Sequence, residues 1–370
     1  MVSATTRMLE TLLPPIAEGL GASLIDMGMV IGAFSVGYGI VQPLTALVAE
    51  RLGKLKLIST LMVAGGIFTY ACSGSNTISE LALFRFFSGL SLGACIALSL
   101  AYIGEFVAFE ERQSIITRFL TGILLGQIFG ACAAGLLSEA MSWRQVFDSF
   151  GALTAFSGLL LASLIFRRRV TDSQTNGTVN PLVYWNVLTS QSARPTLLIA
   201  FLEGSFFFSS FAFVASFLRD IHQWDYLKIG VIMTGYGFGG AGYAFLSASI
   251  NAKITTSKRI FFAGLTVAFA YGLFPWLSNG LSFFICFMAI GFGFYMLHVI
   301  LQTNATEMYP QARGASMCMF ALLIFTGQSL GAPAFAQLII LLNYKASYAL
   351  SAIACLGLAL LFRKYQHAPK

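Results

Sequence analysis

The feature that most constrains this chain is a series of apolar stretches, each about 20 residues long and separated by short polar turns. A helix of that length crosses the roughly 30 Å hydrocarbon core of a bilayer. Only 10% of the residues are charged, whereas soluble domains carry about 25% charge. The sequence therefore predicts an all-α integral membrane protein. Helices are expected at residues 1–17, 27–48, 57–75, 79–103, 114–139, 144–166, 196–218, 227–249, 259–278, 281–303, 314–341 and 345–362.

The basic residues predict the orientation of this bundle. Sixteen of the 22 Lys and Arg residues fall on one side of it and four on the other, while Arg7 and Arg85 lie inside helices. Cytoplasmic loops are enriched in Lys and Arg, so we expect both termini to be cytoplasmic and the chain to lie in a bacterial inner (plasma) membrane. The charge of +7 is dispersed among the loops. Its expected partner is the lipid bilayer, not nucleic acid.

A polar interval divides the chain into two halves of six helices. We expect a first bundle at 1–166, a cytoplasmic linker at 167–194 with a short interfacial helix near 181–188, and a second bundle at 195–370. The halves repeat one pattern, which predicts two similar units in the same orientation. The repeat is offset by 201 residues in Arg112/Arg313, Gly126/Gly327, Gln127/Gln328, Gly130/Gly331 and Arg144/Lys345, and by 202 in Glu105/Glu307.

The offset of 202 residues aligns residue 1 with Glu203, a position inside the seventh helix. The first helix is therefore expected to be truncated, because its cytoplasmic part has no counterpart. Our hypothesis at this stage is a mis-assigned start site or a truncated gene.

The turn after the second helix reads Glu50-Arg51-x-Gly53-Lys54. This resembles the acid-Arg-x-Gly-basic loop between helices two and three of the major facilitator superfamily (MFS). With the internal repeat, the resemblance extends over nearly the whole chain. It implies the MFS fold, in which two six-helix bundles are related by a pseudo-two-fold axis along the membrane normal.

The resemblance also implies a cytoplasmic gate. Glu50 would face the start of the eleventh helix, where the helix dipole favours negative charge. Lys54 would pair with Glu105, close to Arg112 and Arg313. The alternative is an ordinary solvated patch of charges.

Ionisable groups at membrane depth are the candidates for function, because they are costly there. Glu203 precedes three phenylalanines, and such apolar surroundings disfavour the charged carboxylate, so we expect it to exchange a proton or another cation. The alternatives are a carboxylate that pairs with a nearby Arg and one that faces the cytoplasmic vestibule. Arg85 opens a sequence similar to the MFS fourth-helix motif and would line the central cavity, where it either transfers protons or only organises polar groups. Arg7 and Glu10 share a helix face and either contact substrate or neutralise each other.

Other residues are candidates for the cavity or for helix packing. Gly126-x-x-x-Gly130-Ala131-x-x-Ala134-Gly135 is similar to the signature of the 12-helix drug:proton antiporters, although Ala131 stands where that branch has proline. Pro333 retains the proline in the second half. Gly89 and Gly93, like Gly126, Gly130 and Gly135, predict close helix contacts. Possible cavity residues, each with a purely structural alternative, are Gln127, Gln328, Tyr236, Tyr295 and His298.

The sequence therefore predicts a secondary transporter that exports small amphipathic molecules or drugs in exchange for protons. A sugar, amino-acid or other metabolite carrier of the same fold is one alternative, and a transport-inactive or decayed protein is another. An enzyme is not expected, because no nucleophile–base constellation is present. We expect a monomer whose partners are a solute and protons, with no cofactor and no metal.

Overall fold

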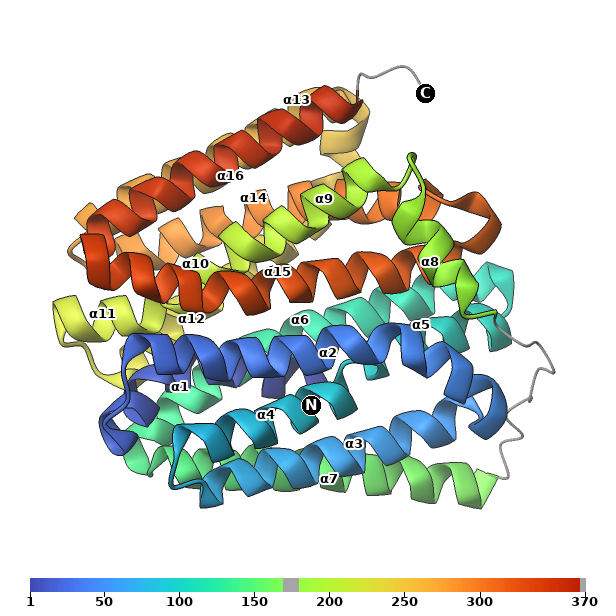
Figure 1. Cartoon of the computed structure of the whole chain (residues 1–370), viewed down its shortest axis with the longest axis horizontal. Helices are drawn as coiled ribbons and strands as arrows, with labels where there is room; N and C mark the ends of the chain where they lie inside the picture. Colours follow the sequence, from blue (N-terminus) through green and yellow to red (C-terminus); the bar gives the residue numbers. More distant parts are fainter. Residues whose placement is uncertain (169–179, 367–370) are drawn as a thin grey trace.

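The computed structural model describes residues 1–168 and 180–366, and Figure 1 shows two layers of long helices, one from each half of the chain. The first half consists of α1 (Val2–Leu20), α2 (Leu24–Leu52), α3 (Lys54–Ala71), α4 (Ile78–Leu92), α5 (Cys95–Phe106), α6 (Phe109–Ala140) and α7 (Trp143–Arg168). The second half consists of α8 (Leu182–Thr189), α9 (Arg194–Glu203), α10 (Ser209–Ala212), α11 (Val214–His222), α12 (Tyr226–Lys253), α13 (Thr256–Leu273), α14 (Gly280–Glu307), α15 (Arg313–Leu342) and α16 (Tyr344–Gln366). Short helical turns η1 to η4 lie at Cys72–Gly74, Gly204–Phe208, Phe274–Trp276 and Pro310–Ala312.

Within these described residues, eleven segments are long and apolar enough to cross a membrane. Helix α1 is not one of them, since it carries Arg7, Glu10 and Glu18 within 19 residues. It nevertheless runs through the bundle and packs against α6, α7 and α11. The all-α fold with two six-helix bundles is therefore confirmed, and its first helix, α1, carries three charged side chains.

Three of the predicted helices differ in detail. The fourth is split into α4 and α5 by a turn at Gly93 and Ala94. The seventh is split into α9, the π-helical turn η2, α10 and α11, with a further break at Phe213. The first helix was expected at residues 1–17, but α1 continues to Leu20 with Pro14 and Pro15 inside it. The short helix predicted near 181–188 is present as α8.

Two helices in each half begin with side-chain caps at equivalent positions of the repeat. The Ser23 and Asp26 side chains form a capping box at α2, and Thr77 and Glu80 form one at α4. Asp225 and Asn279 cap α12 and α14 in the second half. Ser23 and Asp225, like Thr77 and Asn279, are 202 residues apart, so the internal repeat extends to the helix starts.

The repeat is also visible in helix packing. A methyl group at Gly130 on α6 would overlap the Ala4 backbone, and one at Gly331 on α15 would overlap the Ser205 backbone. Ala4 and Ser205 are themselves 201 residues apart. In each half, the fifth membrane-spanning segment therefore packs against the first in the same register.

The two halves meet along two helix pairs, α2 with α15 and α6 with α12. Figure 1 shows α2 and α15 side by side where the two layers meet. We call the end of the bundle with the α2–α3, α5–α6, α12–α13 and α14–α15 turns the basic end, and the opposite end the far end. At the far end, glycines allow the backbones of the two halves to approach closely. Gly135 lies against the backbone of Tyr226 and Gly230, and Gly28 lies against that of Pro333.

Candidate functional site

The centre of the bundle holds an ion pair at the interface of the halves. Arg7 Nη1 donates to Glu10 Oε1 at 2.7 Å, and both side chains are about nine-tenths buried. The Arg7 guanidinium also lies 5.0 Å from the ring centroid of Phe211 and 4.9 Å from that of Tyr236, both from the second half. The local pair predicted from the spacing is present, and cation–π contacts attach it to the opposite bundle.

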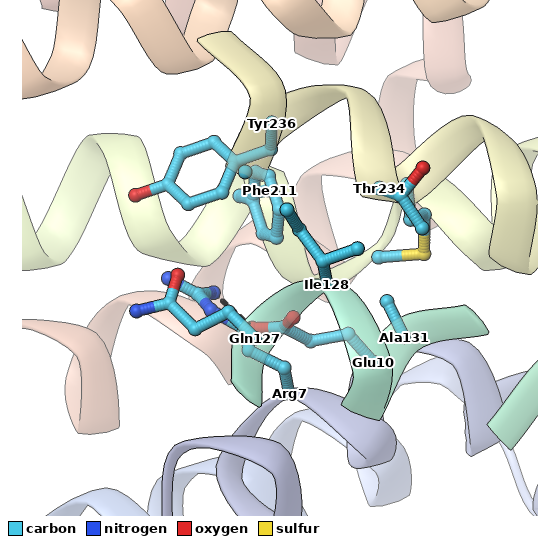
Figure 2. A pocket seen from close by; sticks show the side chains of 10 residues that line it. Arg7, Glu10, Gln127, Ile128, Ala131, Phe211, Thr234 and Tyr236 are labelled. Atoms are coloured by element: carbon cyan, nitrogen blue, oxygen red, sulfur yellow. Dashed lines mark hydrogen bonds and ion pairs between the residues drawn. The ribbon is translucent and has the colours of Figure 1, made fainter. Parts of the chain in front are cut away.

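A small cavity adjoins this pair (Figure 2). Its volume is about 10 Å³, the space of one water molecule. Tyr295 donates its hydroxyl to Gln127 Oε1 at 3.3 Å, while the buried Tyr236 hydroxyl has no hydrogen-bond partner among the described residues. The cavity therefore presents a guanidinium, an amide and a hydroxyl to whatever enters it. Its lining is Arg7, Glu10, Gln127, Ile128, Ala131, Phe211, Met233, Thr234, Tyr236 and Gly237.

A second buried charge lies in the other half, at the end of α9. The Glu203 carboxyl is completely buried, with Oε2 2.9 Å from His298 Nδ1 on α14. Its Oε1 has no partner in the described part of the chain. The His298 ring stacks on Phe294 at 4.9 Å between centroids. The expected alternative of a carboxylate paired with an Arg is therefore wrong; the partner is a histidine.

The π-helical turn begins immediately after Glu203. A methyl group at Gly204 would overlap the Ile324 carbonyl oxygen of α15. Hydroxyl groups of Ser209 and Tyr271 donate to the carbonyl oxygens of Gly204 and Phe207, so the irregular backbone is satisfied by side chains. π-Helical turns occur frequently at functional sites, and this one directly follows the buried acid.

Arg85 is the most unusual side chain of the bundle. It is completely buried, and none of its three guanidinium nitrogens has a hydrogen-bond partner within residues 1–168 and 180–366. Its guanidinium lies 4.0 Å from the ring centroid of Phe34, and Glu10 is the acid with which it interacts electrostatically. Each lost hydrogen bond of a buried charged group costs free energy, so an Arg in this position requires a reason beyond packing.

The remaining predicted candidates lie on α15 or at helix contacts. Gln328 is buried on α15, where its backbone lies beside Gly204. Pro333 lies inside α15, which continues past it. The packing glycines behave as predicted: Gly89 and Gly93 face the backbone of α2, Gly126 and Gly130 face α1, and Gly135 faces α12.

The predicted gate residues at the basic end pair within their own halves. Lys54 forms an ion pair with Glu105, as expected. Arg112 donates to the Val107 carbonyl, and Arg313 pairs with Glu307. Gly53 adopts a positive φ of 84° at the α2–α3 turn, a conformation that favours glycine. The side chains of Glu50 and Arg51 lie outside the described part of the structure.

Sequence reasoning missed a cluster that joins the halves at the far end. Arg219 Nε donates to Glu18 Oε1 at 3.0 Å, and the Tyr226 hydroxyl donates to Glu18 Oε2 at 2.8 Å. The backbone N–H of Tyr226, in the first turn of α12, donates to Glu139. Glu18 and Arg219 are 201 residues apart, so the repeat offset was the signal that could have found them.

No group of three or more His, Cys, Asp or Glu side chains that could hold a metal ion occurs in residues 1–168 and 180–366. The same residues contain buried charges, a central cavity between two helical bundles and eleven apolar spans. Buried charges beside a central cavity, within a bundle of apolar spans, are the arrangement of a multi-pass membrane carrier.

Comparison with known proteins agrees with this class. The sequence profile described as Major Facilitator Superfamily matches residues 1–332, so the chain belongs to that superfamily. It is a transporter of the MFS fold and not an enzyme. The structure is similar to the crystal structure of the nucleoside transporter NupG, with a TM-score of 0.78, 12% identity and coverage of 100% of this chain and 98% of that one.

Three curated relatives match different lengths of the chain. The MFS-type transporter YceJ of Bacillus subtilis is 23% identical over 337 residues, 90% of this chain and 84% of its own. The 4-hydroxybenzoate transporter PcaK of Acinetobacter baylyi is 28% identical over 36% of this chain and 29% of its own. The multidrug export protein EmrB of Escherichia coli is 30% identical over 36% of this chain and 26% of its own.

Proposed function

We propose that the protein is a proton-coupled carrier of small amphipathic molecules, and that Glu203 with His298 holds the coupling proton. The buried carboxyl–imidazole contact supports this role best. A pair at 2.9 Å holds a proton on either partner, and its net charge is −1 without the proton and zero with it. Because a charge is costly at this depth, loading the proton changes the energy of the whole core.

We further propose that the basic end is cytoplasmic and that the halves 1–166 and 195–370 move as two bodies, joined by the linker 167–194. The enrichment of Lys and Arg at the basic end supports this orientation. The Glu18–Arg219–Tyr226 contacts and the close glycine approaches then hold the external end shut. The pair Lys54–Glu105, with Arg112 and Arg313, belongs to the internal gate, which closes when the halves rock the other way.

The direction of transport has two candidate forms. Export in exchange for protons is supported by the relationship to EmrB and by the glycine pattern of α6. Import together with protons is supported by Ala131, which replaces the proline of the antiporter signature. The relationship to PcaK, a 4-hydroxybenzoate transporter, supports an aromatic cargo. Aromatic side chains around Arg7, namely Phe208, Phe211 and Tyr236, suit an amphipathic or aromatic cargo in both forms.

The test is transport by purified protein in proteoliposomes with an imposed pH gradient and a panel of radiolabelled drugs and metabolites. We expect gradient-driven movement of at least one solute, and its sign gives the direction. Glu203→Gln should abolish the response to the pH gradient while solute exchange without a gradient continues. Glu111→Gln, which changes an exposed acid of α6, is the control. Full gradient-driven transport by Glu203→Gln would contradict the proton role, and no movement of any solute by the parent protein would indicate a transport-inactive protein.

A further inference from the structure

The charges in the middle of the bundle restrict the charge of the cargo. At mid-helix depth the Arg, Lys, Asp, Glu and His side chains of the described part of the chain are Arg7, Glu10, Arg85, Glu203 and His298, and the charge count below is that of these side chains. Arg7 forms an ion pair with Glu10, and Arg85 interacts with Cys72 and with the same acid, so Arg7, Glu10 and Arg85 together carry one net positive charge in the first half. Other titratable groups that interact with Glu203 are Tyr236 on α12 and Cys355 on α16, and both side-chain types are neutral near pH 7.

The total charge therefore depends on one proton. Without the proton, the Glu203–His298 pair is negative and balances Arg85, so the core is neutral. With the proton, the pair is neutral and the core carries one net positive charge. An uncompensated charge in a low-dielectric interior is strongly unfavourable, so the protonated core favours a ligand that brings one negative charge.

The cavity beside Arg7 has the donors to receive such a group. The Tyr236 residue is 97% buried, and its hydroxyl is unpartnered among the residues that the structure describes. Figure 2 shows the Arg7 guanidinium and the Gln127 amide next to each other below the Tyr236 ring. A guanidinium, an amide N–H and a hydroxyl are the donor types that bind a carboxylate. A cation would instead approach Arg7 with Arg85 behind it.

We propose, on the basis of the proposed proton coupling, that the cargo is a monoanion with an apolar or aromatic body. Its charged group binds to Arg7, Gln127 and Tyr236, and one anion and one proton occupy the core together. Both moving forms are then neutral in the core: the empty carrier without its proton, and the carrier loaded with anion and proton. Exchange of an anion for a proton would leave a charged core in each direction and is disfavoured for the same reason.

The experiment measures equilibrium binding and proton uptake by the purified full-length chain without any gradient. The probes are two matched series in which only the charge changes: benzoate, benzamide and benzamidine, and octanoate, octanamide and octylamine. We expect the carboxylate of at least one series to bind ten or more times tighter than its amide and amine. In weakly buffered solution it should remove about one proton per bound molecule from the medium.

Variants separate the charge of Arg85 from its packing. Arg85→Gln should lower carboxylate affinity at least tenfold and change amide affinity less than twofold, whereas Arg85→Lys should retain most of the preference for carboxylate. Lys258→Gln, which removes an exposed charge in α13, should have no effect. Equal binding within both series, tightest binding of an amine, no binding of any probe, or an unchanged preference in Arg85→Gln would overturn the proposal. A failure of the proton role appears separately, as gradient-driven transport retained by Glu203→Gln.

Discussion

The ion pair between Glu18 and Arg219 should control how often the far end opens. The pair is partly exposed, with 53% and 28% of the two side chains accessible, and such pairs contribute about 0.2–1 kcal/mol. The Tyr226 hydroxyl adds a hydrogen bond to the same carboxylate, worth about 1 kcal/mol at this exposure. Removing the charge with Glu18→Gln therefore costs the closed far end about 1.5 kcal/mol, roughly a tenfold shift towards opening.

Cysteine labelling measures this shift. Thr11 of α1 is completely buried, and its hydroxyl contacts the Ala131 carbonyl and the Met233 sulfur. Thr11→Cys should therefore react with a membrane-impermeant maleimide only when the far end opens. Four of the six native cysteines are buried and two are half-buried, and a variant without Thr11→Cys measures their background. We expect Glu18→Gln to raise the labelling rate about tenfold and Glu18→Arg with Arg219→Glu to restore much of the parent rate. Asp148→Asn, which removes an acid of α7 near the same end, should have no effect.

Two results would refute this reasoning. A labelling rate within twofold of the parent in Glu18→Gln would show that the pair does not bias the halves. Failure of the charge exchange to lower the rate below that of Glu18→Gln would show that geometry other than the attraction closes the far end.

Three further outcomes are expected. Gly204→Ala should destabilise the protein in detergent by about 1–3 kcal/mol and lower its unfolding temperature, because the new methyl group overlaps the Ile324 carbonyl. Gly357→Ala is the control, since no described atom lies within 4 Å of its new methyl group. Equal unfolding temperatures of the two variants would contradict the packing argument. Arg144→Gln should lower the stability by about 2 kcal/mol in the same assay, since Arg144 donates to the carbonyls of Ser73 and Ser75 at 2.6 and 2.5 Å. Lys345 is its counterpart in the repeat, and its ammonium lies over the Trp276 ring. Lys345→Gln should lower the stability by less than half as much. His298→Phe keeps a ring beside Phe294 but loses the contact with Glu203, so gradient-driven transport should fall at least tenfold while exchange persists; an unchanged pH response would remove His298 from the proton site.

The sequence predicted the parts of this fold that depend on local pattern. Apolar length placed the eleven apolar spans of the described residues, and the repeat offset anticipated the matching contacts of Gly130 and Gly331. The offset changes from 201 to 202 and back between helices, as in the caps at Ser23 and Asp225. The turns absorb this single residue, so the helix registers within each half are preserved.

The parts that depend on helix rotation could not be predicted. Glu203 and His298 are 95 residues apart, and their contact requires knowing which faces of α9 and α14 turn towards each other. The π-helical turn adds one residue to a helix whose sequence pattern is otherwise unchanged. Arg85 was recognised as a candidate from its motif, but its lack of hydrogen-bond partners among the described residues depends on the side chains that other helices bring around it.

The far-end pair has a consequence for how such a chain could have arisen. Glu18 and Arg219 occupy the same place in the two halves, close enough to the pseudo-two-fold axis to touch. Two identical subunits would bring the same residue to both places, and like charges would face each other. Opposite signs require two copies whose sequences have diverged, so neither half could form this ion pair with a second copy of itself.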